Sequence, residues 1–263
     1  MPDSDPAAAL LAAFDTNTQV APLSDVDPAL TLDDGYRIAG EIRTLRTRRG
    51  EDVVGRKIGF TNRTLWPIYN VDAPVWGWMY QSGVHDIPTD GRLALPDLPA
   101  LRIEPEIMFG FKSSPGPDMN LTELSDCIDW VAHGLEIVTS LYPDWRFTAP
   151  DSMAAMAMHG ALWVGARQEP TADRLEALTT CDITLTGPSE TLVGHGVDVL
   201  GGPLMALRHL VGQVGRMPGA EPIKSGEIIT TGTLTDARPI APGETWRTDF
   251  DTPLIDGVTV TFT

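Results

Sequence analysis

Residues 101–111, in which apolar and polar side chains alternate, constrain the fold more than any other segment of this chain. In a β-strand, successive side chains point to opposite faces, so the apolar residues at odd positions face the core. Glu104 and Glu106 then lie side by side on the other face, where like charges repel unless solvent or a cation relieves them. Pro105 cannot donate a ladder hydrogen bond, so we expect this strand at a sheet edge or at a bulge. Considered alone, the pair is also explained by a solvated strand face.

A third acid changes the interpretation of that pair. Glu136 lies inside the apolar run 134–138, where a carboxylate is costly to bury without a partner. It must therefore meet a cation or be protonated. Carboxylates without a convergent cysteine pair favour a hard cation, so we predict Mg²⁺ or Mn²⁺ held by Glu104, Glu106 and Glu136.

Lys57 is the first candidate for a catalytic residue. It shares a strand face with Gly55 and Gly59, and two glycines beside a lysine leave room for a group to approach its ammonium. A lysine in that setting can pair with a carboxylate or relay a proton. A purely structural salt bridge is the alternative.

A threonine cluster flanked by glycine ends a strand near the C-terminus, within residues 224–235. We predict that Thr231, Gly232 and Thr233 bind a substrate carboxylate, because backbone N–H groups and hydroxyls can hold an anion. The segment does not match a phosphate-binding loop.

Helical patterns occupy the beginning of the chain and strand patterns most of the rest. Residues 7–14 form one expected helix, and a longer one begins after Thr31, with Asp34 three residues on and Gly50 at its end. A further helix is expected over 203–214. The expected strands cover residues 53–60, 101–111, 135–140, 160–165, 181–185, 227–231, 245–250 and 258–262.

This order of elements predicts an α+β protein with a mixed, mostly β core. We expect a helical segment with the first strand over residues 1–75 and the catalytic core over residues 76–263, as parts of one continuous domain. The regular strand–helix alternation of a doubly wound nucleotide-binding fold is not found.

Charge and composition exclude several classes of partner. The formal net charge of −17 disfavours nucleic acid, and it means that an anionic substrate needs a local cation. No apolar run approaches the roughly 20 residues of a membrane span, and the N-terminus has no basic segment typical of a secretion signal. The two cysteines form no paired motif, so we expect reduced thiols in a cytoplasmic protein.

The motifs, in this order and spacing, resemble the 2-keto-4-pentenoate hydratase and 4-oxalocrotonate decarboxylase family of the fumarylacetoacetate hydrolase superfamily. The similarity runs from about residue 35 to the C-terminus. It includes VGRKIGFT at 54–61, VDAPVWG at 71–77, IEPEI at 103–107, LEIV at 135–138, DWRF at 144–147, VLGGP at 199–203 and SGEIITTG at 225–232.

The resemblance implies a curled, mixed β-sheet with helices packed outside, and a homo-oligomer. It implies a lyase of aromatic catabolism that hydrates or decarboxylates a small 2-oxo or 2-hydroxy-dienoic acid through a metal-stabilised enolate. Mg²⁺ or Mn²⁺ would be bound by Glu104, Glu106 and Glu136, Lys57 would be the active-site lysine, and Asp72 would be an acid near the substrate.

Residues 151–160 depart from the family pattern, which usually has Ala-Asp-Asn-Ala-Ser here. The polar positions become Ala155, Met156 and Met158, so we expect a more apolar pocket lined by methionine. His159 follows directly, and we predict that it supplies acid–base chemistry.

Two other functions are compatible with the same residues. A C–C bond hydrolase or a tautomerase would use the same metal site, because fold does not fix the reaction. A non-catalytic partner subunit of a hydratase or decarboxylase complex would explain the altered segment. It would not explain why three costly carboxylates are kept together.

Overall fold

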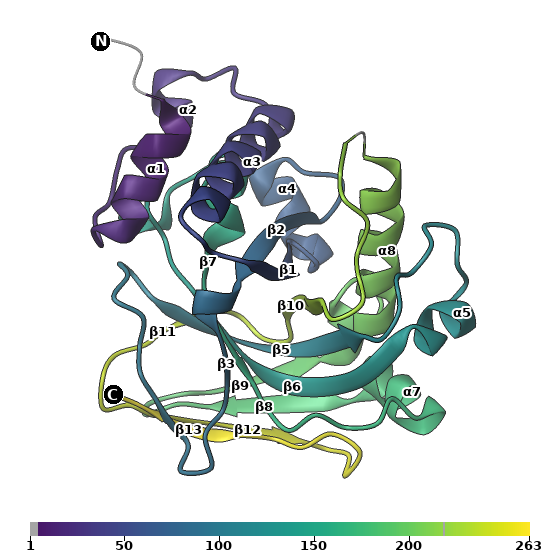
Figure 1. The fold of residues 1–263 in the computed structure, drawn as a ribbon. Coiled ribbons are helices and arrows are strands. Elements are labelled where there is room, and N and C mark those ends of the chain that lie inside the picture. The colour runs from purple at the N-terminus through teal and green to yellow at the C-terminus, as the bar shows by residue number, and fades with distance from the viewer. Residues whose placement is uncertain (1–4, 218) are drawn as a thin grey trace.

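The computed structural model describes residues 5–217 and 219–263 (Figure 1). Its α-helices are α1 (Pro6–Asp15), α2 (Leu23–Val26), α3 (Leu32–Arg48), α4 (Trp66–Tyr69), α5 (Leu121–Asp126), α6 (Ala149–Ala154), α7 (Ala172–Thr180) and α8 (Pro203–Arg216). Its strands are β1 (Val53–Gly59), β2 (Val75–Tyr80), β3 (Val84–Asp86), β4 (Arg92–Leu93), β5 (Arg102–Phe111), β6 (Ile128–Val138), β7 (His159–Val164), β8 (Asp182–Thr186), β9 (Thr191–His195), β10 (Ile228–Thr233), β11 (Arg238–Pro239), β12 (Thr245–Phe250) and β13 (Thr259–Phe262). Short 3-10 turns are η1 (Arg63–Leu65), η2 (Gln81–Gly83), η3 (Pro143–Trp145), η4 (Met156–Met158) and η5 (Gly196–Asp198).

The strands form two sheets. The larger has the order β2-β1-β10-β5-β6-β7-β3 with β11 also paired to β5, and the smaller has the order β4-β13-β12-β8-β9. β1 pairs in parallel with β10 but antiparallel with β2, so the larger sheet is mixed. In Figure 1 this sheet curls between the N-terminal helices and α8, with the smaller sheet beneath it. The predicted α+β fold with a curled, mixed sheet is confirmed.

Apolar and polar side chains alternate along β5, so they lie on opposite faces of the larger sheet, as predicted. Ile103 packs against the smaller sheet, and Ile107 and Phe109 pack in the cluster that includes the apolar face of α8. Burial of each such side chain contributes about 1.5–3 kcal/mol. The opposite, concave face carries Glu104 and Glu106. Because the apolar side chains of β5 are packed in the core, the two acidic side chains must point to this other face.

The N-terminal helices form a layer beside this sheet. α3 begins at a capping box in which Thr31 and Asp34 bond each other's backbone N–H groups, as the sequence predicts. Its inner side packs against α6, and α1 packs against α3. Within the described residues, no helix is long and apolar enough to cross a membrane.

β5 does not lie at an edge, so that alternative for Pro105 is wrong. It runs between β10 and β6, and Pro105 pairs with Leu135 of β6. The carbonyl of Pro105 accepts from Leu234 N, and a residue's N and O point to the same side of an antiparallel strand. Its missing N–H therefore faces the break between β10 and β11, where no ladder partner is required.

Candidate active site

Strand pairing brings the three predicted acidic residues together on the concave face of the larger sheet. Glu104 of β5 is the direct ladder partner of Glu136 of β6, and Glu106 pairs with Gly134, two residues along. One carboxylate oxygen from each acid lies within 4.8 Å of the other two. Glu106 and Glu136 are fully buried, whereas Glu104 is partly exposed, so the cluster opens on the Glu104 side.

The cluster carries more negative charge than the protein compensates. Burial, with the neighbouring Glu136, raises the pKa of Glu104 to about 7, and burial together with the two other acids raises the pKa of Glu106 well above its usual value. Glu106 Oε1 and Glu136 Oε2 are buried without a hydrogen-bond donor. Buried acceptors are normally satisfied, so these two oxygens mark the place where a cation fits.

Lys57 supplies the ammonium that faces this cluster. Its Nζ lies 3.3 Å from Glu136 Oε2, an ion-pair contact that is too poorly aligned for a hydrogen bond. Burial alone would lower the pKa of Lys57, but the three carboxylates outweigh burial and raise it, so the side chain is a cation. Gly55 does not leave room for a ligand as expected, because a Cβ there would lie 2.0 Å from the Ile228 carbonyl of β10.

A break in β10 provides the support for Glu106. The register shifts between Thr230 and Thr233, which frees the Gly232 N–H to donate to Glu106 Oε2 at 2.9 Å. Gly232 has φ +96, and a Cβ there would lie 2.0 Å from Thr61 Oγ1. Glycine is therefore required at this position both by the backbone conformation and by the close approach of Thr61.

The threonines beside Gly232 already have protein partners. Thr231 Oγ1 donates to the Ile107 carbonyl at 3.0 Å, and Thr233 Oγ1 donates to the Thr235 carbonyl at 2.7 Å. Thr230 Oγ1, in contrast, is buried without a partner, and Thr230 pairs with Lys57 across β1 and β10. Thr230 was not predicted as a site residue, although strand alternation places it on the face of Lys57, opposite to Thr231.

His159 lies next to the carboxylates. Its Nδ1 is 2.8 Å from Glu136 Oε1, and its Nε2 is buried without a partner. With Lys57, His159 holds the pKa of Glu136 below its usual value, although burial alone would raise it. The ring contacts a predicted metal ligand directly, so its position fixes the orientation of that carboxylate.

The altered segment reaches His159 through a strained turn. Met156, Ala157 and Met158 have φ values of 57°, 53° and 63°, and this left-handed conformation costs about 1–2 kcal/mol per residue. The two methionine side chains pack with α1 and α3 in the N-terminal cluster, where Met156 Sδ also meets Arg46. They fill the core beneath the helical layer.

Asp72 is not one of the three clustered acids. It is exposed in the loop between α4 and β2, and no ion pair or hydrogen bond joins its carboxylate to another described residue. His133 faces the smaller sheet. Its Nδ1 donates to the Glu106 carbonyl of β5, and its Nε2 accepts from Thr248 Oγ1 of β12. Burial lowers the pKa of His133 to about 4, so this histidine is neutral and braces the backbone of Glu106.

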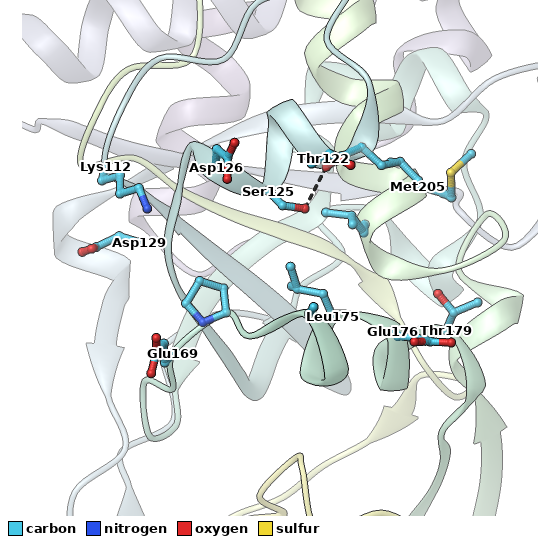
Figure 2. A pocket seen from close by; sticks show the side chains of 14 residues that line it. Lys112, Thr122, Ser125, Asp126, Asp129, Glu169, Leu175, Glu176, Thr179 and Met205 are labelled. Atoms are coloured by element: carbon cyan, nitrogen blue, oxygen red, sulfur yellow. Dashed lines mark hydrogen bonds between the residues drawn. The ribbon is translucent and has the colours of Figure 1, made fainter.

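A surface groove lies elsewhere, between α5, α7 and α8 (Figure 2). It has a volume of about 690 Å³, and its rim includes Asp126, Asp129 and Glu169 beside Lys112. None of the predicted site residues lines it. The predicted metal ligands and Lys57 are therefore separate from this groove.

The close approach of Gly232 to Thr61 yields a stability prediction. Gly232→Ala should destabilise the protein by roughly 2–5 kcal/mol, because backbone strain of about 1–2 kcal/mol adds to overpacking of about 1–3 kcal/mol. Gly226→Ala is the matched control, since Gly226 has φ +87 but nothing within 4 Å of its Cβ position. Urea denaturation should show a clearly larger loss for Gly232→Ala, and equal losses would contradict the described geometry.

Comparison with known proteins identifies relatives of this chain. The chain matches no protein-family model. It is 31% identical over 227 residues to a 2-hydroxyhexa-2,4-dienoate hydratase from Comamonas testosteroni, covering 86% of this chain and 84% of that protein. It is 29% identical to a 2-keto-4-pentenoate hydratase from Paraburkholderia xenovorans, covering 96% of both chains.

Solved structures show the same relationship. A 4-oxalocrotonate decarboxylase from Pseudomonas putida G7, in complex with magnesium and adipate, matches with a TM-score of 0.87 at 25% identity, covering 98% of this chain and 96% of that chain. A fumarylpyruvate hydrolase from Pseudomonas aeruginosa, in complex with Mn²⁺ and pyruvate, shares the fold with a TM-score of 0.60 at 13% identity, covering 79% and 88%. This chain therefore belongs to the 2-keto-4-pentenoate hydratase and 4-oxalocrotonate decarboxylase family of lyases.

Proposed function

We propose that this protein is a lyase that hydrates or decarboxylates a small 2-oxo acid, with Glu104, Glu106 and Glu136 holding Mg²⁺ or Mn²⁺. The observation that carries the proposal is the convergence of three carboxylates, two of them fully buried, on a single ammonium. The relative of known structure that binds magnesium and adipate supports the same assignment.

The residues present fit a hard divalent cation. The donor set consists only of carboxylate oxygens, which Mg²⁺ and Mn²⁺ prefer. Glu106 Oε1 and Glu136 Oε2 lack hydrogen-bond donors, and the one ammonium of Lys57, beside Glu136 Oε2, does not balance three carboxylates. When bound, the cation supplies electrophilic stabilisation of the negative charge that develops on the substrate oxygens.

The chain's own residues orient this site. The Gly232 N–H fixes Glu106 and the His159 ring fixes Glu136, so neither ligand can turn away. Lys57 stays a cation and is placed to balance the substrate carboxylate, because it faces the same cluster from β1. Substrate would enter beside Glu104, the one partly exposed acid.

His159 holds Glu136, and its acid–base role stays a prediction. Contacts of Asp72, Thr231, Gly232 and Thr233 with substrate also stay predictions. A homo-oligomeric state, a cytoplasmic location and the division at residue 75 also stay predictions. An enzyme that cleaves C–C bonds or catalyses tautomerisation would use the same carboxylate cluster. Turnover by the isolated protein would distinguish any of these enzymes from a non-catalytic subunit.

Glu106→Gln tests the metal assignment. A neutral amide keeps the size of the side chain but removes one anionic ligand. Loss of a residue that only supports a metal ligand costs roughly 10–100-fold in metal affinity, so loss of the ligand itself should lower Mg²⁺ affinity by more than that. Titration calorimetry measures this, with Glu176→Gln in the exposed acidic groove as the charge-matched control. Equal affinities of wild type and Glu106→Gln would rule out the assignment.

Lys57→Met tests the role of the ammonium. Turnover of 2-oxo acids should fall by at least about 100-fold, while Mg²⁺ affinity should not fall, because the three ligands lose a competing cation. Lys112→Met is the control, since Lys112 is an exposed lysine of the groove. A variant that keeps its turnover but loses Mg²⁺ affinity would show that Lys57 only braces the ligands.

A further inference from the structure

β9 (Thr191–His195) lies at the end of the smaller sheet with one edge free. The larger sheet ends at β2 and β3, and the smaller sheet ends at β4 and β9. β2 is almost entirely buried, with α6 and η4 packed against it. β3 has three residues and β4 has two, whereas β9 has five and pairs only with β8. β9 is therefore the longest exposed edge strand among the described residues.

Two hydrogen bonds show which way the backbone groups of β9 point. At one end of the β8–β9 hairpin, the N–H of Gly187 donates to the carbonyl of Glu190 at 2.9 Å. At the other end, the N–H of Gly196 donates to the carbonyl of Cys181, also at 2.9 Å. Bonded and non-bonded residues alternate along an antiparallel strand, so the even-numbered residues of β9 face β8. The N–H and C=O groups that point to the free edge belong to the odd-numbered residues, which are Thr191, Val193 and His195, and among the described residues these groups have no backbone partner.

The side chains along this edge lack the features that normally block strand pairing. Native edge strands carry a lysine, a proline, an inward-pointing charge or a bulge. Residues 191–197 contain no acidic residue, lysine, arginine or proline, and the β8–β9 register has no shift. Val193 is 62% exposed, and Val197, just beyond the strand, is 53% exposed. The edge therefore offers both unpaired backbone groups and exposed apolar side chains to a partner strand.

The charge of the chain favours this edge for contact between two copies. A formal net charge of −17 makes two copies repel each other over most of their surface. Residues 191–197 carry none of that negative charge, and the acid that precedes them, Glu190, is ion-paired with Arg238 at 2.9 Å. Asp182, opposite His195 in β8, is bonded to that histidine at 2.6 Å. The edge is therefore a stretch of surface where like charges need not meet.

The outward-pointing residues of β9 are complementary to a second copy of themselves. Strands related by a two-fold axis run antiparallel, and such an axis pairs one surface patch with the same patch of the partner. With the axis at Val193, the odd-numbered residues meet as hydrogen-bonded pairs, in which Val193 faces its own copy and Thr191 faces His195 of the second copy. Cross-strand pairs of β-branched side chains stabilise a sheet, and no like charges lie opposite each other in this register.

We propose that β9 pairs with β9 of a second copy of this chain, antiparallel across a two-fold axis at Val193. The two smaller sheets then form one continuous sheet, and the protein is a dimer through this edge. The contact uses no residue of the carboxylate cluster, which lies on the larger sheet, so this inference does not depend on the proposed function.

Sedimentation velocity of the full chain tests the interface. The wild type at micromolar concentration should be a dimer, or a larger assembly with an even number of chains, and Val193→Lys should halve its mass. The lysine puts two ammonium groups opposite each other at the axis, as in edge strands that resist pairing. Val26→Lys is the control, because Val26 is a valine of α2 that is 85% exposed, and this variant should keep the wild-type mass. A monomeric wild type would overturn the proposal, and so would a Val193→Lys variant with the mass of the wild type.

Val193→Cys tests the register by a second measurement. In a hydrogen-bonded antiparallel pair the two Cα atoms lie about 5.5 Å apart. A disulfide spans Cα separations of roughly 4.4–6.8 Å, so mild oxidation should link two Val193→Cys chains. The native Cys127 and Cys181 are buried, and Val26→Cys is the matched exposed control. Val193→Cys chains that stay unlinked, or that link no faster than Val26→Cys chains, would contradict the pairing at Val193.

Discussion

Mutual repulsion among Glu104, Glu106 and Glu136 opposes folding, because their oxygens lie within 4.8 Å of one another in a largely buried site. The surrounding structure can be understood from how it offsets that repulsion. Lys57 brings one positive charge from β1, Gly232 donates its N–H to Glu106, and His159 bonds Glu136. These contacts still leave two buried oxygens without donors, so the protein is built to receive one more cation.

The scaffold explains how so much charge is held in one place. The odd-numbered residues of β5 are anchored in apolar clusters beneath the sheet, which leaves the even-numbered residues no freedom to turn away from the concave face. The register shift within β10 frees the Gly232 N–H, and the break between β10 and β11 accommodates Pro105. Two neighbouring irregularities beside β5 thus support a predicted metal ligand and tolerate a proline in a central strand.

The metal-ligand candidates could be predicted from the sequence because strand alternation is a local property, and Glu136 in an apolar run needs a cation wherever it is placed. The surroundings of Gly232 could not be predicted in the same way, since its N–H reaches Glu106 only through a register shift between strands that are far apart in the chain. Methionines 156 and 158 were expected in a pocket, but their left-handed turn directs them into the cluster under α1 and α3.

Anomalous diffraction from crystals soaked with Mn²⁺ and oxalate would locate the metal site. We expect one dominant Mn²⁺ peak bonded to an oxygen of each of Glu104, Glu106 and Glu136, with oxalate completing the coordination on the Glu104 side. Mn²⁺ that leaves these carboxylates empty while it occupies another acidic site, such as the groove beside Asp126 and Asp129 in Figure 2, would contradict it.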